Sequence, residues 1–475
     1  MPSFHDSTRR AFLRRTGALG FMGAAAPWAA TLSTLAEAAG AATTGNDYKA
    51  LVCVFLAGGN DHGNLLIPCD PGVAPEADTE YTAYAQARST LALPRSSLAG
   101  TVLDPLSGVP SGRHVAFPPQ WAPLKTLFGA GRLAVLSNIG PLLRPTTLAD
   151  YQRNADLPPR LFSHNDQQAV WQSYHPEGGT VGWGGRVGDL LLSSNGTKAS
   201  FTCINVAGNA VYLAGQSVIP CTVAPGGPEP LLAASGTLFG SSKASEVFRA
   251  LVTRQDHPVP MARTHANAMV RAIAAQQDLE AALATAPSSL SAHFTTAVNG
   301  VPRRLAQQLL TVARCIAARQ SLGLKRQVFF VSLGGFDLHD RMAIDHPALL
   351  TQVAEALVSF DAALGQLGLR EQVTTFTASD FGRTLTSNGD GSDHGWGGHQ
   401  LVMGGAVAGR RVYGTLPAAG LAAPHVGQGR LLPTLSVDQL AASLARWMGV
   451  PTADLALVAP RHQAFDAGVL SGLLS

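Results

Sequence analysis

The chain has 475 residues with a formal net charge of +3, and 46% of its residues are hydrophobic and 14% charged. This length and apolar content can fill the core of one large domain or two ordinary ones, and the charge argues against a nucleic-acid-binding surface. The five cysteines lack a Cys-x-x-Cys pair, which argues against a zinc–thiolate site, although Cys203 and Cys221 could pair outside the cell.

The first 38 residues read as an export signal. Thr8–Arg14 (TRRAFLR) is a twin-arginine signature, an uncharged Ala/Gly-rich stretch follows over 16–30, and Ala36–Ala38 forms a small-x-small cleavage site. An amphipathic first helix or an uncleaved anchor is the alternative. We expect the twin-arginine translocase to export the folded chain, so that the mature protein, without a stable membrane span, is periplasmic or secreted.

The mature part, 46–475, opens with a strand-and-helix rhythm. A short apolar run over 48–57 predicts a buried strand, and Asp61 follows it at a glycine turn. Asp61 is there either a strand-end ligand or an ordinary turn residue. A helix over 119–128 and a strand over 132–137 continue the pattern, which favours a parallel sheet.

A second group of polar residues lies in RLFSHNDQQAVWQSY at 160–174. Ser163 is placed at the start of a helix, where it is either a simple N-cap, with His164 as a polar contact, or a nucleophile beside free backbone N–H groups, with His164 as a second candidate catalytic residue. GWGGR at 182–186 allows close backbone approach and carries Arg186. Arg186 could bind an anion or pair with Asp189, and both readings stay open.

The region around 207–300 reads as a loop- and helix-rich insertion that follows a strand over 200–206. Helices are expected over 261–286 and 302–324, where apolar residues recur at helical spacing. The insertion therefore adds to a single α/β domain and is not counted as a second one.

The clearest architecture comes next: a strand over 327–333, a helix over 346–367 and a strand over 372–377. A unit of this length is a right-handed parallel crossover, which brings the carboxyl ends of both strands to one edge. Residues that follow the two strands should therefore share that edge. A strand over 400–403 and a helix over 437–448 close the chain.

Six candidate metal ligands follow turn or strand-end signals: Asp61, Asp337, His339, Asp380, His394 and His399. Mixed carboxylate and imidazole ligands suit zinc, manganese, iron or calcium, and a pair of such metals about 4 Å apart would hold a tetrahedral ester. Arg383 and Arg186 could neutralise the remaining oxygens of that ester.

Five blocks of this sequence resemble, in order, those of the DUF1501 family. They are GGNDHGN (58–64), FSHNDQQ (162–168), GWGGR (182–186), GGFDLH (334–339) and SDFGRT…NGDGSDHGWGGH (379–399). The resemblance spans nearly the whole chain, and the last block is the most specific. It implies an alkaline-phosphatase-like three-layer α/β/α fold with a mostly parallel central sheet, as in the alkaline phosphatase/sulfatase superfamily.

The same resemblance implies roles for single residues. Asp61 looks like the first-strand Asp of the superfamily, Ser163 like its helix-N-terminal nucleophile, and Asp337 with His339 like its Asp/His pair. Asp380 looks like the Asp of its Asp-His pair, and His394 or His399 like its late histidine. The sequence departs from that pattern at Phe381, where the superfamily carries a histidine ligand.

The function expected from these observations is an exported metal-dependent hydrolase of a phosphate, sulfate or related ester. Its partner would be a small-molecule or glycan ester, with no nucleic acid involved. The alternative is a non-catalytic exported binding or assembly protein that keeps the fold and part of the site, because one histidine ligand is missing.

Overall fold

The strand β1 (Lys49–Ala57) lies in the middle of the molecule, and its alternating side chains build two cores. Ala50, Val52, Val54 and Leu56 face one hydrophobic cluster, whereas Leu51, Cys53 and Phe55 face the other. A strand with both faces buried reads as a continuous apolar run, which is the pattern of this segment.

The computed structural model describes residues 47–208, 210–231, 233, 236–422 and 424–475. Residues Tyr48–Ser475 form one compact unit. The predicted twin-arginine signal falls within 1–46, outside the described residues.

Nine strands of the described chain form the central sheet, in the order β12-β4-β11-β10-β1-β9-β5-β6, with β13 also paired to β4. Besides β1, these strands are β4 (Leu133–Gly140), β5 (Cys203–Asn205), β6 (Cys221–Thr222), β9 (Arg326–Gly334), β10 (Val373–Ser379), β11 (Gly398–Met403), β12 (Val412–Gly414) and β13 (Leu435–Ser436). Only β11 runs antiparallel to its two neighbours, β10 and β4. The expectation of a mostly parallel sheet is confirmed.

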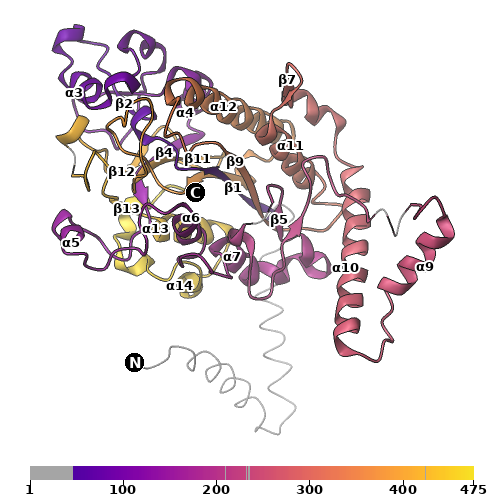
Figure 1. The fold of residues 1–475 in the computed structure, drawn as a ribbon. Coiled ribbons are helices and arrows are strands. Elements are labelled where there is room, and N and C mark those ends of the chain that lie inside the picture. The colour runs from indigo at the N-terminus through magenta and orange to yellow at the C-terminus, as the bar shows by residue number, and fades with distance from the viewer. Residues whose placement is uncertain (1–46, 209, 232, 234–235, 423) are drawn as a thin grey trace. The chain divides into compact units, whose positions relative to one another are not determined.

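Helices cover both faces of this sheet (Figure 1). On one face lie α4 (Ala122–Gly129), α11 (Arg304–Ala317) and α12 (Met342–Gln366). On the other lie α6 (His164–Ser173), α7 (Trp183–Leu191), α13 (Val437–Met448) and α14 (Leu455–Val458). The predicted α/β class is therefore confirmed.

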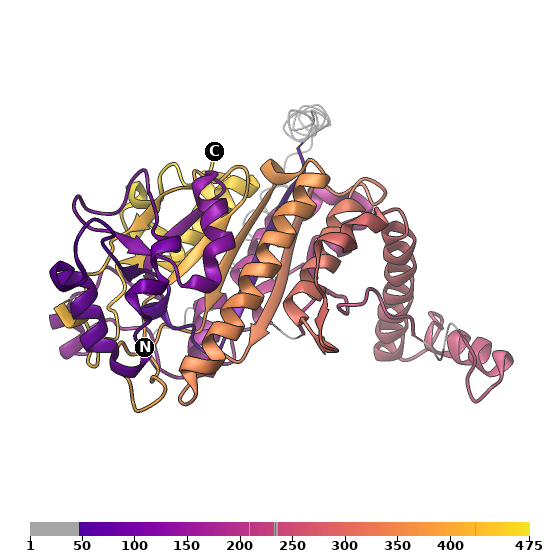
Figure 2. The same cartoon turned by 90° about the horizontal axis from the view of Figure 1, so that it is seen from above.

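The remaining helices and strands lie around this core. They are α3 (Thr79–Arg88), α5 (Leu148–Gln152), α9 (Ser242–Val252), α10 (Pro260–Leu283), the two-stranded antiparallel sheet β2/β3 (Ile67–Pro68, Val115–Ala116) and the short hairpin β7/β8 (Ala297–Val298, Val301–Pro302). Figures 1 and 2 show α9 and α10 extending from the side of the domain, in the region expected as an insertion.

The helix α12 crosses the face of the sheet along its length (Figure 2). In the part of the chain that the structure describes, it is the one helix long and apolar enough to span a membrane. Half of the apolar 18-residue stretch of α12 that meets this test is buried inside the protein.

The GWGGR segment forms the start of α7, where its glycines let the 211–215 backbone approach closely, as expected. Two predicted elements differ from the observed ones. The strand expected over 200–206 is confined to β5, and the helix expected over 302–324 ends at Ala317, before a turn with a positive φ at Gly323. The cysteines are free thiols, including Cys203 and Cys221.

The strands β10, β1 and β9 lie side by side and run parallel. Their carboxyl ends therefore form one rim, as expected from the crossover. The segment after β9 carries Asp337 and His339, and the segment after β10 begins with Asp380. This rim positions the candidate site.

Candidate metal centre

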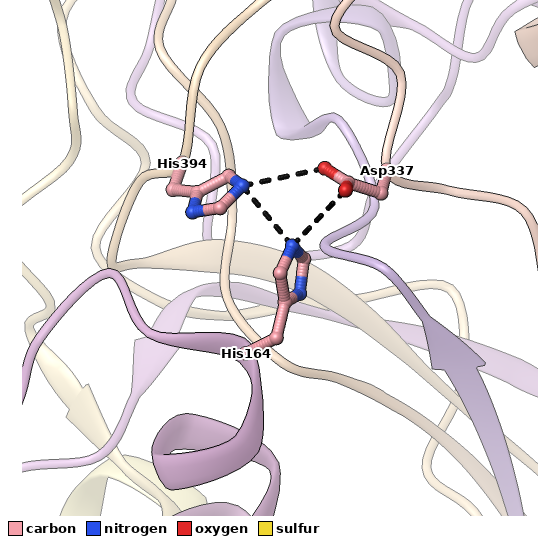
Figure 3. Close-up of side chains that lie close together, drawn as sticks. All are labelled: His164, Asp337 and His394. Atoms are coloured by element: carbon pink, nitrogen blue, oxygen red, sulfur yellow. Dashed lines mark hydrogen bonds and ion pairs between the residues drawn. The ribbon is translucent and has the colours of Figure 1, made fainter.

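Three side chains from distant parts of the sequence meet at this rim (Figure 3). We call His164, Asp337 and His394 the triad. His164 Nε2 lies 3.3 Å from Asp337 Oδ2 and 3.0 Å from His394 Nε2, and His394 Nε2 lies 3.3 Å from Asp337 Oδ1. One ligand atom from each residue lies within 4.8 Å of the others, a spacing at which a single cation could contact all three.

The tautomers of the two histidines are fixed by hydrogen-bond acceptors behind them. His164 Nδ1 lies 2.7 Å from Asp380 Oδ2, and His394 Nδ1 lies 2.7 Å from the carbonyl oxygen of Phe162. A carboxylate and a carbonyl only accept, so each Nδ1 carries the proton and each Nε2 keeps its lone pair. This is how metal-binding histidines are oriented in proteins.

Two nitrogen lone pairs 3.0 Å apart repel each other unless a positive charge lies between them. The hydrogen bond to Asp380 raises the pKa of His164, and burial lowers the pKa of His394. A divalent cation satisfies the same two lone pairs together with the Asp337 carboxylate, so these residues fit a metal.

Asp380 orients His164 and does not face the triad directly. Its buried carboxylate accepts hydrogen bonds from Gly58 N (3.1 Å) and Gln168 Nε2 (2.8 Å) in addition to the bond with His164. Asp380, expected as a metal ligand, therefore acts by holding His164 and does not itself contact the cation position.

We expect Asp380→Ala to lower the affinity for a divalent metal by about 10–100-fold, because His164 loses the partner that fixes its tautomer and orientation. Titration with zinc, followed by calorimetry, measures this. The variant Gln168→Ala, which removes a second partner of the same carboxylate, should have a smaller effect. Equal affinity in the wild type and Asp380→Ala would contradict the assignment.

Arg383, expected to bind the anion, instead holds Asp337. Its NH1 lies 3.0 Å from Asp337 Oδ1, and the guanidinium also donates to the backbone carbonyls of Gly58 and Ser392. The side chain is fully buried. Burial alone would raise the pKa of Asp337, but the bond from Arg383 and the neighbouring charges lower it, so the carboxylate stays ionised.

His339 lies at the edge of the triad. Its Nε2 is 2.9 Å from His394 Nε2 and 3.1 Å from Asp337 Oδ1, and its Nδ1 is 3.2 Å from Asp393 Oδ1. The imidazole is 45% exposed, more than either histidine of the triad. The structure thus brings His339 beside the triad with an oriented ring and an accessible face.

Asp61 and His399, both expected among the ligands, lie elsewhere. Asp61 forms a fully buried ion pair with Arg88 at 2.6 Å and accepts the Gly63 N–H, which matches the turn alternative. His399 is in β11, where its Nδ1 accepts the Asn138 N–H at 3.1 Å. Each side chain is held by a partner outside the triad, so the structure brings neither of them to it.

Ser163 and Arg186, expected as catalytic residues, also have other partners. Ser163 takes the N-cap position of α6, but its hydroxyl donates to Asp166 Oδ2 at 2.8 Å and makes no capping bond. Arg186 donates to the carbonyl oxygen of Leu457 at 3.4 Å, and Asp189 instead accepts backbone N–H groups of residues 216–218. The structure brings neither Ser163 nor Arg186 to the triad.

Three buried histidines outside the triad make the fold sensitive to acid. Burial lowers the pKa of His62 and His346 to about 4 and that of His399 to about 3. An unfolded histidine has a pKa of about 6.5 and binds a proton first, so stability present above pH 6.5 is lost as the pH falls toward the folded value.

We expect His399 alone to reduce the free energy of unfolding by about 2 kcal/mol between pH 7 and pH 5. Urea unfolding of the wild type and His399→Asn at both pH values isolates this contribution, because asparagine can still accept the Asn138 N–H but does not titrate. The same fall in both proteins would contradict a neutral buried His399.

The fold and this group define the chain as an α/β protein with a two-histidine, one-carboxylate group at the carboxyl ends of parallel strands. The chain belongs to the family described as "Protein of unknown function (DUF1501)", whose model matches residues 48–459. No curated protein matches it.

Two solved structures are similar in fold. One is a Bacteroides thetaiotaomicron protein of glycosaminoglycan metabolism, with 10% identity and a TM-score of 0.36, covering 90% of this chain and 77% of that one. The other is the PsFucS1 sulfatase from Pseudoalteromonas sp., with 8% identity and a TM-score of 0.32, covering 88% and 70% respectively.

Proposed function

We propose that the protein is an exported metal-dependent hydrolase of a phosphate, sulfate or related ester, with one divalent cation held by the triad. A single observation carries the proposal: two imidazoles, each pinned at Nδ1 by an acceptor, turn their Nε2 lone pairs toward each other and toward a carboxylate. Such an arrangement is what a bound cation requires.

The ligand set points to the kind of metal. Imidazole and carboxylate ligands together suit zinc, iron or manganese, whereas calcium prefers oxygen ligands alone. Of the metals expected from the sequence, zinc and manganese therefore fit the triad better than calcium. Three protein ligands are also typical of catalytic sites, because they leave a position for water or substrate.

The cation would supply Lewis acidity to an ester oxygen. The protein's own residues do the positioning: Asp380 and the Phe162 carbonyl hold the two imidazoles, and Arg383 holds Asp337. The Ser163 hydroxyl is bonded to Asp166. We therefore assign no covalent step to Ser163, and the proposal is one of direct hydrolysis.

The export part of the proposal rests on the twin-arginine pattern of the first 38 residues. It suits a metal protein, because a chain that crosses the membrane folded can bind its metal beforehand. We propose a periplasmic or secreted location, and fractionation of cells that express the full chain tests it.

Elemental analysis of the purified protein, together with a screen of phosphate and sulfate monoesters and phosphodiesters, tests the enzyme. We expect about one divalent metal per chain and turnover that a chelator removes and added metal restores. A protein that binds no divalent metal under any loading condition would overturn the proposal.

A second candidate is a non-catalytic exported binding protein on the same fold. It is favoured by the buried Asp61–Arg88 pair, which removes one expected ligand, and by the engagement of Ser163 with Asp166. Metal bound by the triad without turnover of any ester class would select this candidate.

A further inference from the structure

We propose that a cavity lined by His62 and His399 is a binding site for a small uncharged carbonyl compound. The two imidazoles meet edge to face with ring centroids 5.9 Å apart, and both line a cavity of about 50 Å³. The triad residues are not among the residues that line it. The inference is thus independent of the proposed hydrolase.

Both histidines present an N–H donor. His62 Nδ1 accepts the backbone N–H of Arg383 at 3.3 Å, and His399 Nδ1 accepts that of Asn138 at 3.1 Å. A neutral imidazole that accepts at Nδ1 carries its proton on Nε2. In the described structure His62 Nε2 is fully buried and has no hydrogen-bond partner. An unmade bond of this kind costs about 1–3 kcal/mol, which an acceptor in the cavity would recover once a small shift of the His62 ring brings its buried Nε2 to the cavity wall.

The surroundings favour an uncharged acceptor. Burial lowers the pKa of both histidines, so they donate as neutral groups. Arg113 lines the cavity, but its guanidinium is paired with Glu80 at 2.7 Å and also donates to the backbone carbonyls of residues 416–417. The charge of Arg113 is therefore neutralised by Glu80. An anion that entered the cavity would lose its hydration without gaining an unpaired positive charge in return.

The shape of the cavity limits the ligand to a few heavy atoms. Apolar side chains form much of the wall: Leu66, Pro68, Val115, Leu385, Leu416 and Leu431. The lining residue Ala418 is exposed, so the cavity reaches the surface. The volume corresponds to about three or four water positions. A carbonyl oxygen between two N–H donors, with a short apolar group against the wall, matches this lining.

Three molecules of the same shape test the chemistry: acetamide, acetate and acetamidinium. Acetamide is an uncharged acceptor, acetate an anionic acceptor and acetamidinium a cation without an acceptor. In ¹⁵N-histidine-labelled protein we expect acetamide to shift the Nε2 resonances of His62 and His399, and to bind at least about tenfold more tightly than the other two. A crystal soaked in acetamide should show its oxygen between the two rings.

Two substitutions of His399 distinguish the loss of its Nε2–H donor from a loss of folding. His399→Asn keeps an acceptor for the Asn138 N–H but removes the Nε2 donor, and should weaken acetamide about tenfold. His399→Gln restores an amide N–H near that position and should recover part of the affinity. Tighter binding of acetate, equal binding of acetamidinium, or a soaked crystal with only water in the cavity would each overturn the inference.

Discussion

Replacing Asp337 with alanine should abolish tight binding of a divalent metal. Asp337 offers the triad its only negative charge, and its Oδ1 and Oδ2 lie 3.3 Å from His394 Nε2 and His164 Nε2 respectively. Loss of an outer-shell partner typically costs about 10–100-fold in metal affinity, so loss of the ligand itself should cost at least about 100-fold. Metal content after dialysis and calorimetric titration with zinc and manganese measure the effect.

A surface carboxylate provides the matched control. Asp104 is 86% exposed and pairs with Arg410 far along the chain, so Asp104→Ala removes the same group without touching the triad. Wild-type metal affinity is expected for it. If Asp337→Ala binds metal as tightly as Asp104→Ala, the triad is not a metal site, and the hydrolase proposal fails with it.

The Asp337→Ala variant also tests the contact between Asp337 and Arg383. Arg383 is fully buried and would keep its backbone partners but lose its one carboxylate partner. An uncompensated buried cation destabilises a fold, so stability should fall together with metal affinity. Asp337→Asn, which keeps an oxygen acceptor for Arg383, should recover stability more than metal affinity. That difference distinguishes a metal ligand from a purely structural carboxylate.

The fold was predictable where the pattern was local and repeated. The strands β1, β9 and β10 are apolar runs closed by turn residues, and α13 lies at the predicted bounds because Ser436 and Gly449 mark its two ends. The crossover rule then placed the ends of the parallel strands on one rim. The close backbone approach expected at GWGGR is confirmed, because the glycines at the start of α7 lie against the 211–215 backbone.

The site was predictable in part, because strand ends indicate where side chains gather but not which of them turn inward. Asp337 and His394 were expected ligands and lie in the triad, and His164 was expected as a catalytic neighbour. Asp393 gave only a weak signal, because its role depends on the orientation of His339. The choice between His394 and His399, five residues apart, depends on where β11 begins, which no local pattern fixes.

Asp61 shows most clearly what the sequence could not reveal. It follows the central strand at the rim, as a ligand would. Its partner, Arg88, is the last residue of α3 and lies in a segment without any motif. An ion pair between residues 27 positions apart leaves no spacing signature. The same carboxylate is thus a plausible ligand by sequence and a structural anion by its contacts.

That ion pair leads to the second large expected effect. Arg88→Ala should reduce the free energy of unfolding by about 3–5 kcal/mol, because it leaves the Asp61 carboxylate buried and unpaired. Both side chains are fully buried, and Arg88 also donates to the carbonyl oxygens of Thr384 and Leu385. Arg88 thereby ties α3 to the segment that carries Arg383. Urea unfolding at pH 7 measures the loss.

An exposed ion pair of the same chain provides the comparison for this loss of stability. Arg254 and Asp256 lie 2.7 Å apart with 53% and 79% of their side chains exposed, so Arg254→Ala should cost less than about 1 kcal/mol. The double variant Asp61→Leu/Arg88→Met should be more stable than Arg88→Ala, since replacing both charges removes the unpaired anion. A cost for Arg88→Ala no larger than that for Arg254→Ala would show that water reaches Asp61, which would then be free to act as the ligand first expected.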